Sequence, residues 1–155
     1  MLPYHEVREK EQENTLLGLK CLFHLYSKEG LYPGQPAILL HIRDNGPTSP
    51  SVLAKHLGVS TASVGVSIKR LEHAGYVRKQ RNPNDLRYVT VSLTPKGAKA
   101  CCRAEALSDV LNNHRLAGFT EEELQQFTDY LTRINRNLAD YLTSLQGEAE
   151  GSGKH

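Results

Sequence analysis

The chain has 155 residues, of which 39% are hydrophobic and 23% charged, and its formal net charge is +2. This length predicts one globular domain, with or without helical extensions, that folds without disulfides or metals. No apolar run reaches the roughly 20 residues of a membrane helix, and the charged first residues do not fit a signal peptide. With three cysteines, two of them adjacent, these features predict a cytoplasmic protein that has no disulfide framework and no membrane partner.

The charge is unevenly distributed along the chain. Residues 41–103 carry 11 Lys/Arg and 3 Asp/Glu, a net of +8, whereas the two flanks together have a net of −6. This pattern favours a middle segment that faces a polyanion and ends that serve another purpose. A basic surface that is only solvated is the alternative, and charge alone does not decide between them.

The N-terminal third predicts two helices. Leu16, Leu19, Phe23 and Tyr26 repeat at spacings of 3, 4 and 3, which predicts an amphipathic helix over residues 5–28. A shorter helix is expected over residues 37–43, where it ends before an Asn-Gly-Pro turn.

The next segment predicts a pair of short helices. Ser49 followed by Pro50 fits a helix N-cap and first position, and Ser60 fits the N-cap of a second helix after a glycine turn. Within the second helix, Val64, Ile68 and Leu71 recur on one face, and Gly75 ends it. The pair is typical of a helix-turn-helix, although ordinary helical packing would give the same pattern.

A basic hairpin follows the helix pair. Residues 77–80 and 88–93 are predicted strands joined by a turn-prone segment, and residues 69–88 have a net charge of +4. A hairpin in this place is typical of a wing, whose tip inserts an arginine into the minor groove of DNA. Asp85 and Arg87 lie at that tip, where the carboxylate can orient the guanidinium. A solvent-facing ion pair of little energetic value is the alternative.

The C-terminal third predicts two more helices. One begins at Thr94-Pro95 and runs to about Leu116, and the other begins at a capping box of Thr120 and Glu123. The last helix carries a heptad-like seam, which requires a partner surface and predicts dimerisation. The seam residues are Leu124, Phe127, Leu131, Ile134, Leu138, Tyr141 and Leu145. The small polar residues 147–155 are predicted to be a disordered tail.

These motifs together resemble the MarR family of winged helix-turn-helix transcriptional regulators. The resemblance rests on Val-Leu-Ala-Lys-His-Leu-Gly-Val-Ser at residues 52–60, Ile-Lys-Arg-Leu-Glu-His-Ala-Gly-Tyr-Val at 68–77, Asp-Leu-Arg at 85–87 and Leu-Thr-Pro-Lys-Gly at 93–97. It implies a mainly α fold with a small β-hairpin wing, and a homodimer formed by the first and last helices. It further implies a repressor that binds pseudo-palindromic operators in double-stranded DNA and is released by a small-molecule effector.

The resemblance also implies a division of the chain and of its DNA contacts. Residues 1–32 and 98–146 would form the dimerisation parts, and residues 33–97 the DNA-binding domain. The second helix of the pair would read the major groove. Its candidate contacts are Ser60, Thr61, Ala62, Ser63, Gly65, Val66 and Ser67. The candidate phosphate contacts are Ser51, Lys69, Arg70, Lys79 and Arg81. Relatives often hold Arg at the position of Val66 and Thr at that of Gly65, so direct guanine readout is expected to be weak.

The effector site is less defined by the sequence. By resemblance, a pocket is expected between the dimerisation helices and the winged domain, lined by Leu16, Leu19, Phe23 and His41, although these residues could equally be core. A subgroup of the family senses hydroperoxides through a cysteine in the first helix, which makes Cys21 a candidate, but a packed thiol is the alternative. Cys21, His24 and His114 are too few to predict a metal site, and no cofactor is expected.

Two other classes of function are alternatives to a DNA-binding regulator. The sequence has no nucleophile elbow, no Gly-rich phosphate loop and no recognisable acid–base pair, so an enzyme is not predicted. A winged-helix module that binds only proteins would explain the fold. The basic wing argues against that alternative, because such a module has no use for Arg87 beside Asp85.

Overall fold

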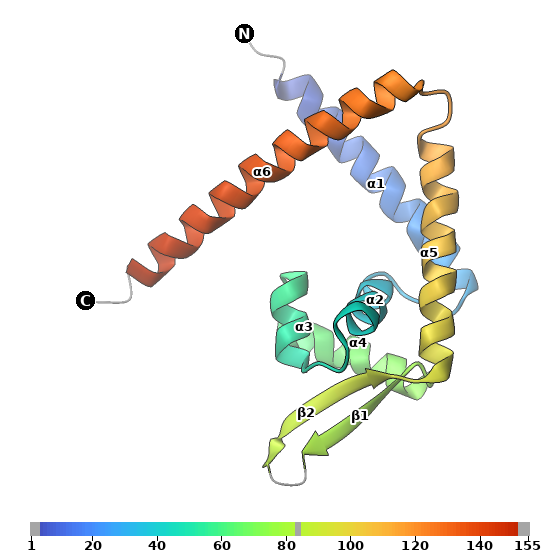
Figure 1. The fold of residues 1–155 in the computed structure, drawn as a ribbon, viewed down its shortest axis with the longest axis vertical. Coiled ribbons are helices and arrows are strands. Elements are labelled where there is room, and N and C mark those ends of the chain that lie inside the picture. Colours follow the sequence, from blue (N-terminus) through green and yellow to red (C-terminus); the bar gives the residue numbers. More distant parts are fainter. Residues whose placement is uncertain (1–3, 83–84, 152–155) are drawn as a thin grey trace. The chain divides into compact units, whose positions relative to one another are not determined.

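The computed structural model describes the backbone of residues 4–82 and 85–151, and the side-chain surroundings of residues 4–81 and 88–146. Two compact units make up the chain, Met1–His114 and Arg115–His155. The elements are α1 (Tyr4–Lys28), α2 (Gln35–Asn45), α3 (Pro50–Leu57), α4 (Thr61–His73), β1 (Val77–Asn82), β2 (Asp85–Leu93), α5 (Pro95–Arg115) and α6 (Glu121–Gly151) (Figure 1). This order confirms the predicted mainly α fold with one β-hairpin. None of the described helices is long and apolar enough to cross a membrane.

The helix-turn-helix of α3 and α4 is set by two serine caps and one glycine. Ser49 Oγ accepts a hydrogen bond from the Val52 N–H at 3.3 Å, and Ser60 Oγ accepts one from the Ser63 N–H at 3.1 Å. Gly58 ends α3 with φ of 65°, in the left-handed region where glycine carries no steric penalty. The predicted caps and turn are confirmed.

The core of the first unit lies between α2, α3, α4 and the base of the hairpin. One face of α4 is buried, as the spacing of its apolar residues predicts. The exposed fractions of Val64, Ile68 and Leu71 are 0–1%. They belong to the same buried cluster as Leu39 of α2 and Leu53 of α3. The cluster continues through Val77 and Val91 of the hairpin into Ala100, Cys101 and Ala104 of α5. This core orients the opposite face of α4 toward solvent.

The hairpin is longer than the sequence predicts. Its antiparallel register runs from Val77 opposite Leu93 to Arg81 opposite Val89, with an irregularity after Arg81. The polar residues at the end of β1 join the ladder because its hydrogen bonds come from the backbone. Thr48 forms an isolated antiparallel bridge to β2, since its N–H donates to the Val91 carbonyl at 3.0 Å and its carbonyl accepts from the Val91 N–H at 2.7 Å.

The start of α5 is fastened to the end of α4. Thr94 Oγ1 donates to the Gly75 carbonyl at 2.6 Å and accepts from the Gly97 N–H at 3.1 Å. Lys96 Nζ donates to the Ala74 carbonyl at 2.6 Å. A Cβ atom at Gly97 would lie 2.0 Å from the Tyr76 carbonyl oxygen, so only glycine fits there. We call residues 74–76 and 94–97 the α5 junction.

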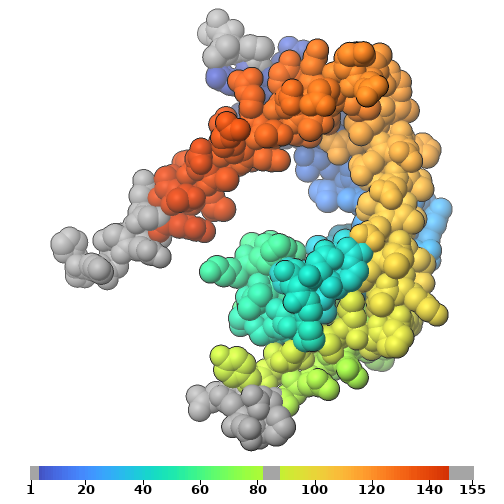
Figure 2. Space-filling view, in the orientation of Figure 1, coloured from blue at the N-terminus to red at the C-terminus, as the bar shows by residue number. Residues whose placement is uncertain are grey.

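Side-chain contacts attach the body of α5 to α1 and α2. The Tyr26 hydroxyl lies 3.0 Å from Ser108 Oγ, and Arg43 Nη1 of α2 lies 2.6 Å from Glu105 Oε2. In Figure 2, α2 in cyan lies directly against α5 in yellow. The hydrogen bonds from Arg43 to Asp44 and Glu105 raise the pKa of this guanidinium, which keeps it charged.

The second unit is dominated by α6. The capping box is confirmed, because Thr120 Oγ1 accepts from the Glu123 N–H at 3.2 Å and the Glu123 carboxylate accepts from the Thr120 N–H at 2.8 Å. Residues 147–151, part of the tail predicted to be disordered, continue the helix instead. Glutamate and alanine in this segment have good helix propensity, which the prediction from its small and polar composition did not take into account. Residues 152–155 lie outside the described part of the chain.

Candidate nucleic-acid interface

The outer face of α4 is made of small side chains at its N-terminal half. Thr61, Ala62, Ser63, Gly65 and Val66 are exposed, and Ser67 is half-buried. No atom other than the helix backbone and chain neighbours lies within 4 Å of a Cβ built at Gly65. A helix with so few long side chains can approach another surface closely, as a recognition helix must in the major groove.

Two of the predicted base-contacting hydroxyls are engaged in capping the helix. Ser60 Oγ lies 2.9 Å from Ser63 Oγ in addition to accepting the Ser63 N–H. Ser60 therefore has a structural function at the start of α4, which the sequence also predicts. Within the described part of the chain, Thr61 Oγ1 makes no hydrogen bond, so its donor and acceptor face solvent.

Cations border this face on two sides. Lys69 and Arg70 are exposed in the second half of α4, and Arg81 is exposed on β1. Ser51, another predicted phosphate contact, is exposed at the start of α3. The Arg70 guanidinium lies 5.5 Å from the centre of the Tyr32 ring, a cation–π geometry that holds the long side chain against the protein.

Lys79, a predicted phosphate contact, is paired with an acidic side chain of α4. Its Nζ lies 2.9 Å from Glu72 Oε2, and its backbone N–H donates to Glu72 Oε1 at 3.3 Å. These two hydrogen bonds hold the pKa of Glu72 below its ordinary value. Sequence reasoning missed the pair because the two residues lie on different elements, and the turn between α4 and β1 decides whether they meet. The contact fixes the hairpin relative to α4.

The predicted wing-tip pair lies in β2, which begins at Asp85 and includes Arg87. The side chains of residues 82–87 lie outside the described part of the chain, so the contact between Asp85 and Arg87 remains a prediction.

The predicted effector residues do not come together in one pocket. Leu16 and Leu19 are exposed on α1, where they border a shallow cavity of about 480 Å³ lined by α1 alone. Phe23 is exposed on the same helix. His41 is half-buried on α2, with its ring centre 4.3 Å from that of His56 on α3. The expectation of a single pocket lined by these residues thus has no support within one chain.

The three cysteines occupy different environments. Cys101 is fully buried, and burial raises the pKa of its thiol. Cys102 and Cys21 are exposed. Cys21 borders a cavity of about 530 Å³ between α1 and α5, together with His24 and His114. Among the described residues, no three His, Cys, Asp or Glu side chains are placed to hold a metal ion.

The predicted seam lies along α6 without a covering surface. Leu131, Ile134 and Leu138 are 39%, 41% and 60% exposed. Tyr141 and Leu145 are also exposed, and Leu124 and Phe127 are half-buried at the start of the helix. Phe127 lies against Phe119, with ring centres 6.5 Å apart.

A helix-turn-helix followed directly by an antiparallel hairpin defines the winged helix-turn-helix class. The MarR family model matches residues 31–89. The HTH-type transcriptional regulator YcgE of Bacillus subtilis is 33% identical over 132 residues, which cover 81% of this chain and 82% of that protein. The chain belongs to the MarR family and is a transcriptional regulator.

Solved structures share this fold. Wild-type MarR of E. coli in its apo form superimposes with a TM-score of 0.72 at 24% identity, covering 86% of this chain and 97% of that one. A mutant E. coli MarR complexed with operator DNA gives a TM-score of 0.68 at 25% identity, covering 86% of this chain and 94% of that one.

Proposed function

We propose that this regulator binds a pseudo-palindromic operator in double-stranded DNA as a homodimer and represses transcription until a small-molecule effector releases it. The observation that carries the proposal is the exposed, small-residue face of α4, bordered by Lys69, Arg70 and Arg81. In this arrangement α4 enters the major groove, and the cations bind the flanking phosphates. The operator complex of the similar E. coli MarR supports the same partner.

The proposed contacts divide into two kinds. Thr61, Ser63 and Ser67 supply hydroxyls for base edges, and Ala62 and Val66 supply apolar contacts for thymine methyl groups. At the wing, Arg87 enters the minor groove with Asp85 orienting its guanidinium. Because no arginine occupies the exposed first half of α4, sequence choice depends more on DNA shape than on direct guanine readout.

The homodimer is supported by apolar surface that a single chain leaves exposed. On α1, Leu16, Leu19 and Phe23 are each more than 50% exposed, and the α6 seam is exposed from Leu131 to Leu145. Contiguous apolar surface of this kind marks an interaction site in a folded protein. We assign residues 1–32 and 98–146 to the dimerisation parts and residues 33–97 to the DNA-binding part, so that two copies of α4 address two half-sites.

Fluorescence anisotropy tests DNA binding. A labelled duplex from the protein's own upstream region and a scrambled duplex are titrated at several salt concentrations. We expect specific binding that weakens with salt, because phosphate contacts release counterions. Lys69→Gln removes a cation from the proposed interface, and Lys99→Gln removes an exposed cation from α5 as the matched control.

The salt dependence distinguishes the outcomes. Lys69→Gln should reduce the slope of log affinity against log salt by about one per protomer, and Lys99→Gln should leave it unchanged. Equal effects of the two variants on this slope would mean that α4 is not part of the DNA interface. Binding to neither duplex at low salt would instead favour a winged-helix module that contacts proteins.

A further inference from the structure

Two histidines meet at the contact between α2 and α3. The ring centre of His41, on α2, lies 4.3 Å from that of His56, on α3, and the ring planes form an angle of 46°. Figure 1 shows these two helices side by side. His41 is half-buried and His56 is exposed, so solvent reaches the two rings. We call these two residues the histidine pair.

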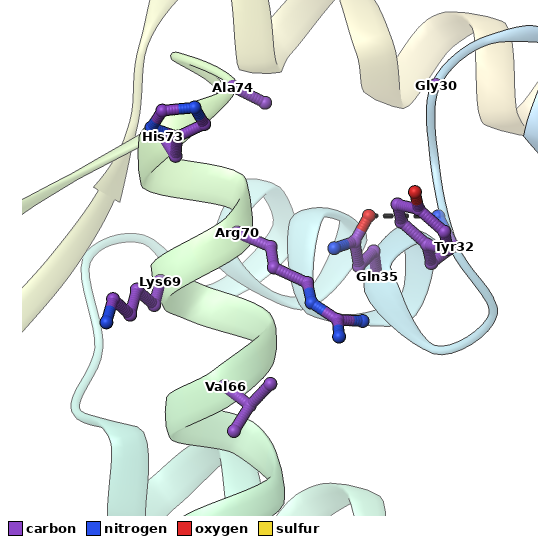
Figure 3. A pocket seen from close by; sticks show the side chains of 8 residues that line it. All are labelled: Gly30, Tyr32, Gln35, Val66, Lys69, Arg70, His73 and Ala74. Carbon is purple, nitrogen blue, oxygen red and sulfur yellow. Dashed lines mark hydrogen bonds between the residues drawn. The ribbon is translucent and has the colours of Figure 1, made fainter.

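The histidine pair is separate from the cavities of the first unit that the structure describes elsewhere. A cavity of about 720 Å³ beside α4 is lined by other residues, among them Tyr32, Gln35 and Arg70 (Figure 3). The cavity at Cys21 lies between α1 and α5. A function of the histidine pair would therefore be additional to that of either cavity.

The protein core holds the two rings in a fixed relation. Ile42, which follows His41, is 3% exposed, and Leu53 of α3 is fully buried in the same core cluster. Asn45 Nδ2 donates a hydrogen bond to the His41 carbonyl at 3.0 Å and lies 3.5 Å from His41 Nδ1. Asn45 therefore covers the Nδ1 side of the ring, which leaves Nε2 as the nitrogen available to a ligand.

The surroundings of His41 favour a cation. Asp44 lies three residues further along α2, and its carboxylate accepts a hydrogen bond from Arg43 Nε at 2.8 Å. This hydrogen bond holds the pKa of the Asp44 carboxyl below its ordinary value, and a protonated His41 lowers the pKa further. The carboxylate is thus within electrostatic reach of the His41 ring, where it stabilises positive charge.

The spacing of the rings fits two imidazoles on one metal ion. A metal–nitrogen bond is about 2.1 Å long, and the ring centre lies about 1.1 Å behind the nitrogen. A right angle at the metal then puts the ring centres about 4.5 Å apart, and a tetrahedral angle puts them about 5.2 Å apart. The observed 4.3 Å agrees better with the right angle, which Ni²⁺ and Cu²⁺ prefer with nitrogen and oxygen ligands.

We infer that the histidine pair binds a divalent transition-metal ion with right-angled coordination, Ni²⁺ or Cu²⁺, through one nitrogen of each ring. Water occupies the remaining positions of the ion, since the described residues offer no group of three protein ligands. One imidazole comes from α2 and the other from the first helix of the helix-turn-helix. The ion therefore joins these helices and stabilises the folded state. This inference does not depend on DNA binding.

Metal binding is measured by isothermal titration calorimetry on the full chain. Ni²⁺ is the probe because, unlike Cu²⁺, it does not oxidise exposed thiols, and Mg²⁺, which prefers oxygen ligands, is the control cation. His56→Gln removes one imidazole at an exposed position, and His41→Gln removes the other. His73→Gln makes the same change at an exposed position of α4 and is the matched control. Thermal melts without metal verify that each variant is folded.

We expect Ni²⁺ to bind wild type and His73→Gln with equal affinity, and His41→Gln and His56→Gln at least tenfold more weakly. The double variant should bind no more weakly than either single variant, because both changes remove the same two-ligand site. Ni²⁺ is paramagnetic, so it should broaden the amide NMR signals of residues 40–45 and 53–58 most. It should also raise the melting temperature of wild type but not that of His56→Gln.

Three results would overturn the inference. The first is equal Ni²⁺ affinity of wild type and His56→Gln, and the second is Mg²⁺ binding as tight as that of Ni²⁺. The third is a loss of affinity in His24→Gln as large as that in His56→Gln, which would place the ion at the cavity of Cys21, His24 and His114. Because His56 is exposed, its variant keeps the test decisive even if His41→Gln does not fold.

Discussion

Helices α4 and α6 carry similar apolar stripes, but the stripe is buried in α4 and exposed in α6. In α4, Val64, Ile68 and Leu71 are at most 1% exposed because α2, α3 and the hairpin cover them. In α6, Leu131, Ile134 and Leu138 are 39–60% exposed. Apolar burial stabilises a helix only where a partner surface exists. One part of the chain therefore has a complete core, and the other leaves an apolar stripe exposed that the proposed dimer would cover.

A charge placed in the α6 seam should have the largest effect, and it tests whether the seam mediates dimerisation. Leu131→Asp should weaken dimerisation by about 1,000-fold, or about 4 kcal/mol, because a two-fold dimer would bury two unpaired carboxylates. Thr132→Asp adds the same charge beside the seam and should have little effect. Sedimentation velocity over a range of concentrations measures both, and a dimer that survives Leu131→Asp would show that the seam does not contact the partner.

A substitution in the α5 junction tests how tightly the complete core is packed. Gly97→Ala should lower the free energy of unfolding by about 3 kcal/mol, because the new Cβ would lie 2.0 Å from the Tyr76 carbonyl oxygen. Gly65→Ala, where a Cβ meets no atom within 4 Å, should instead stabilise α4 by up to about 1 kcal/mol. Urea denaturation measures both values. Equal stabilities would mean that the junction accommodates a side chain.

The adjacent residues Cys101 and Cys102 occupy a buried and an exposed position on one helix, so they allow a direct test of burial. Cys101→Ser should destabilise the protein by about 2 kcal/mol because it buries a hydroxyl, whereas Cys102→Ser should be neutral. Since burial raises the pKa of the Cys101 thiol, its contribution to stability is lost as the pH rises into the alkaline range. The alkaline loss of stability should therefore be smaller in Cys101→Ser, and an identical pH profile would contradict the assigned burial.

The smallest expected effect concerns the link between α4 and the hairpin. Glu72→Gln should cost about 0.5 kcal/mol at neutral pH, since the pair with Lys79 is partly exposed. The pKa of Glu72 is lowered in the folded state, so its contribution is present above the ordinary carboxylate pKa and lost as the pH falls through the lowered value. Chemical denaturation at pH 7 and pH 3 measures the difference. Glu11→Gln, at an exposed position of α1, is the control.

Local chemistry made much of the winged part predictable. The caps at Ser49, Ser60 and Thr120 were identifiable because a cap involves residues within one turn. The core face of α4 followed from helical periodicity alone. By contrast, the pairing of Lys79 with Glu72 depends on how a turn places two elements, which no short-range pattern encodes.

The least predictable feature was the cavity lined by Tyr32, Gln35 and Arg70, because it joins a loop to a helix distant in sequence. The sequence also marked Gly97 within a family motif, but only the distance to Tyr76 explains why glycine is needed there. The effector pocket predicted from the sequence is the opposite case, because the sequence suggested it and the structure does not bring its residues together. Its four residues share apolar or aromatic character, yet Leu16 and His41 lie on different helices in separate environments.

The α5 junction has a mechanical consequence. Since Lys96 and Thr94 are bonded to the carbonyls of Ala74 and Gly75, just after α4, we expect α4, the hairpin and the first turn of α5 to move as one piece. The 21 residues of α5 span about 30 Å, which makes this helix a lever with the junction at one end. A tilt of about 5° at its far end would displace α4 by roughly 3 Å, and in the proposed dimer this shift would bring the two copies of α4 out of step with successive major grooves.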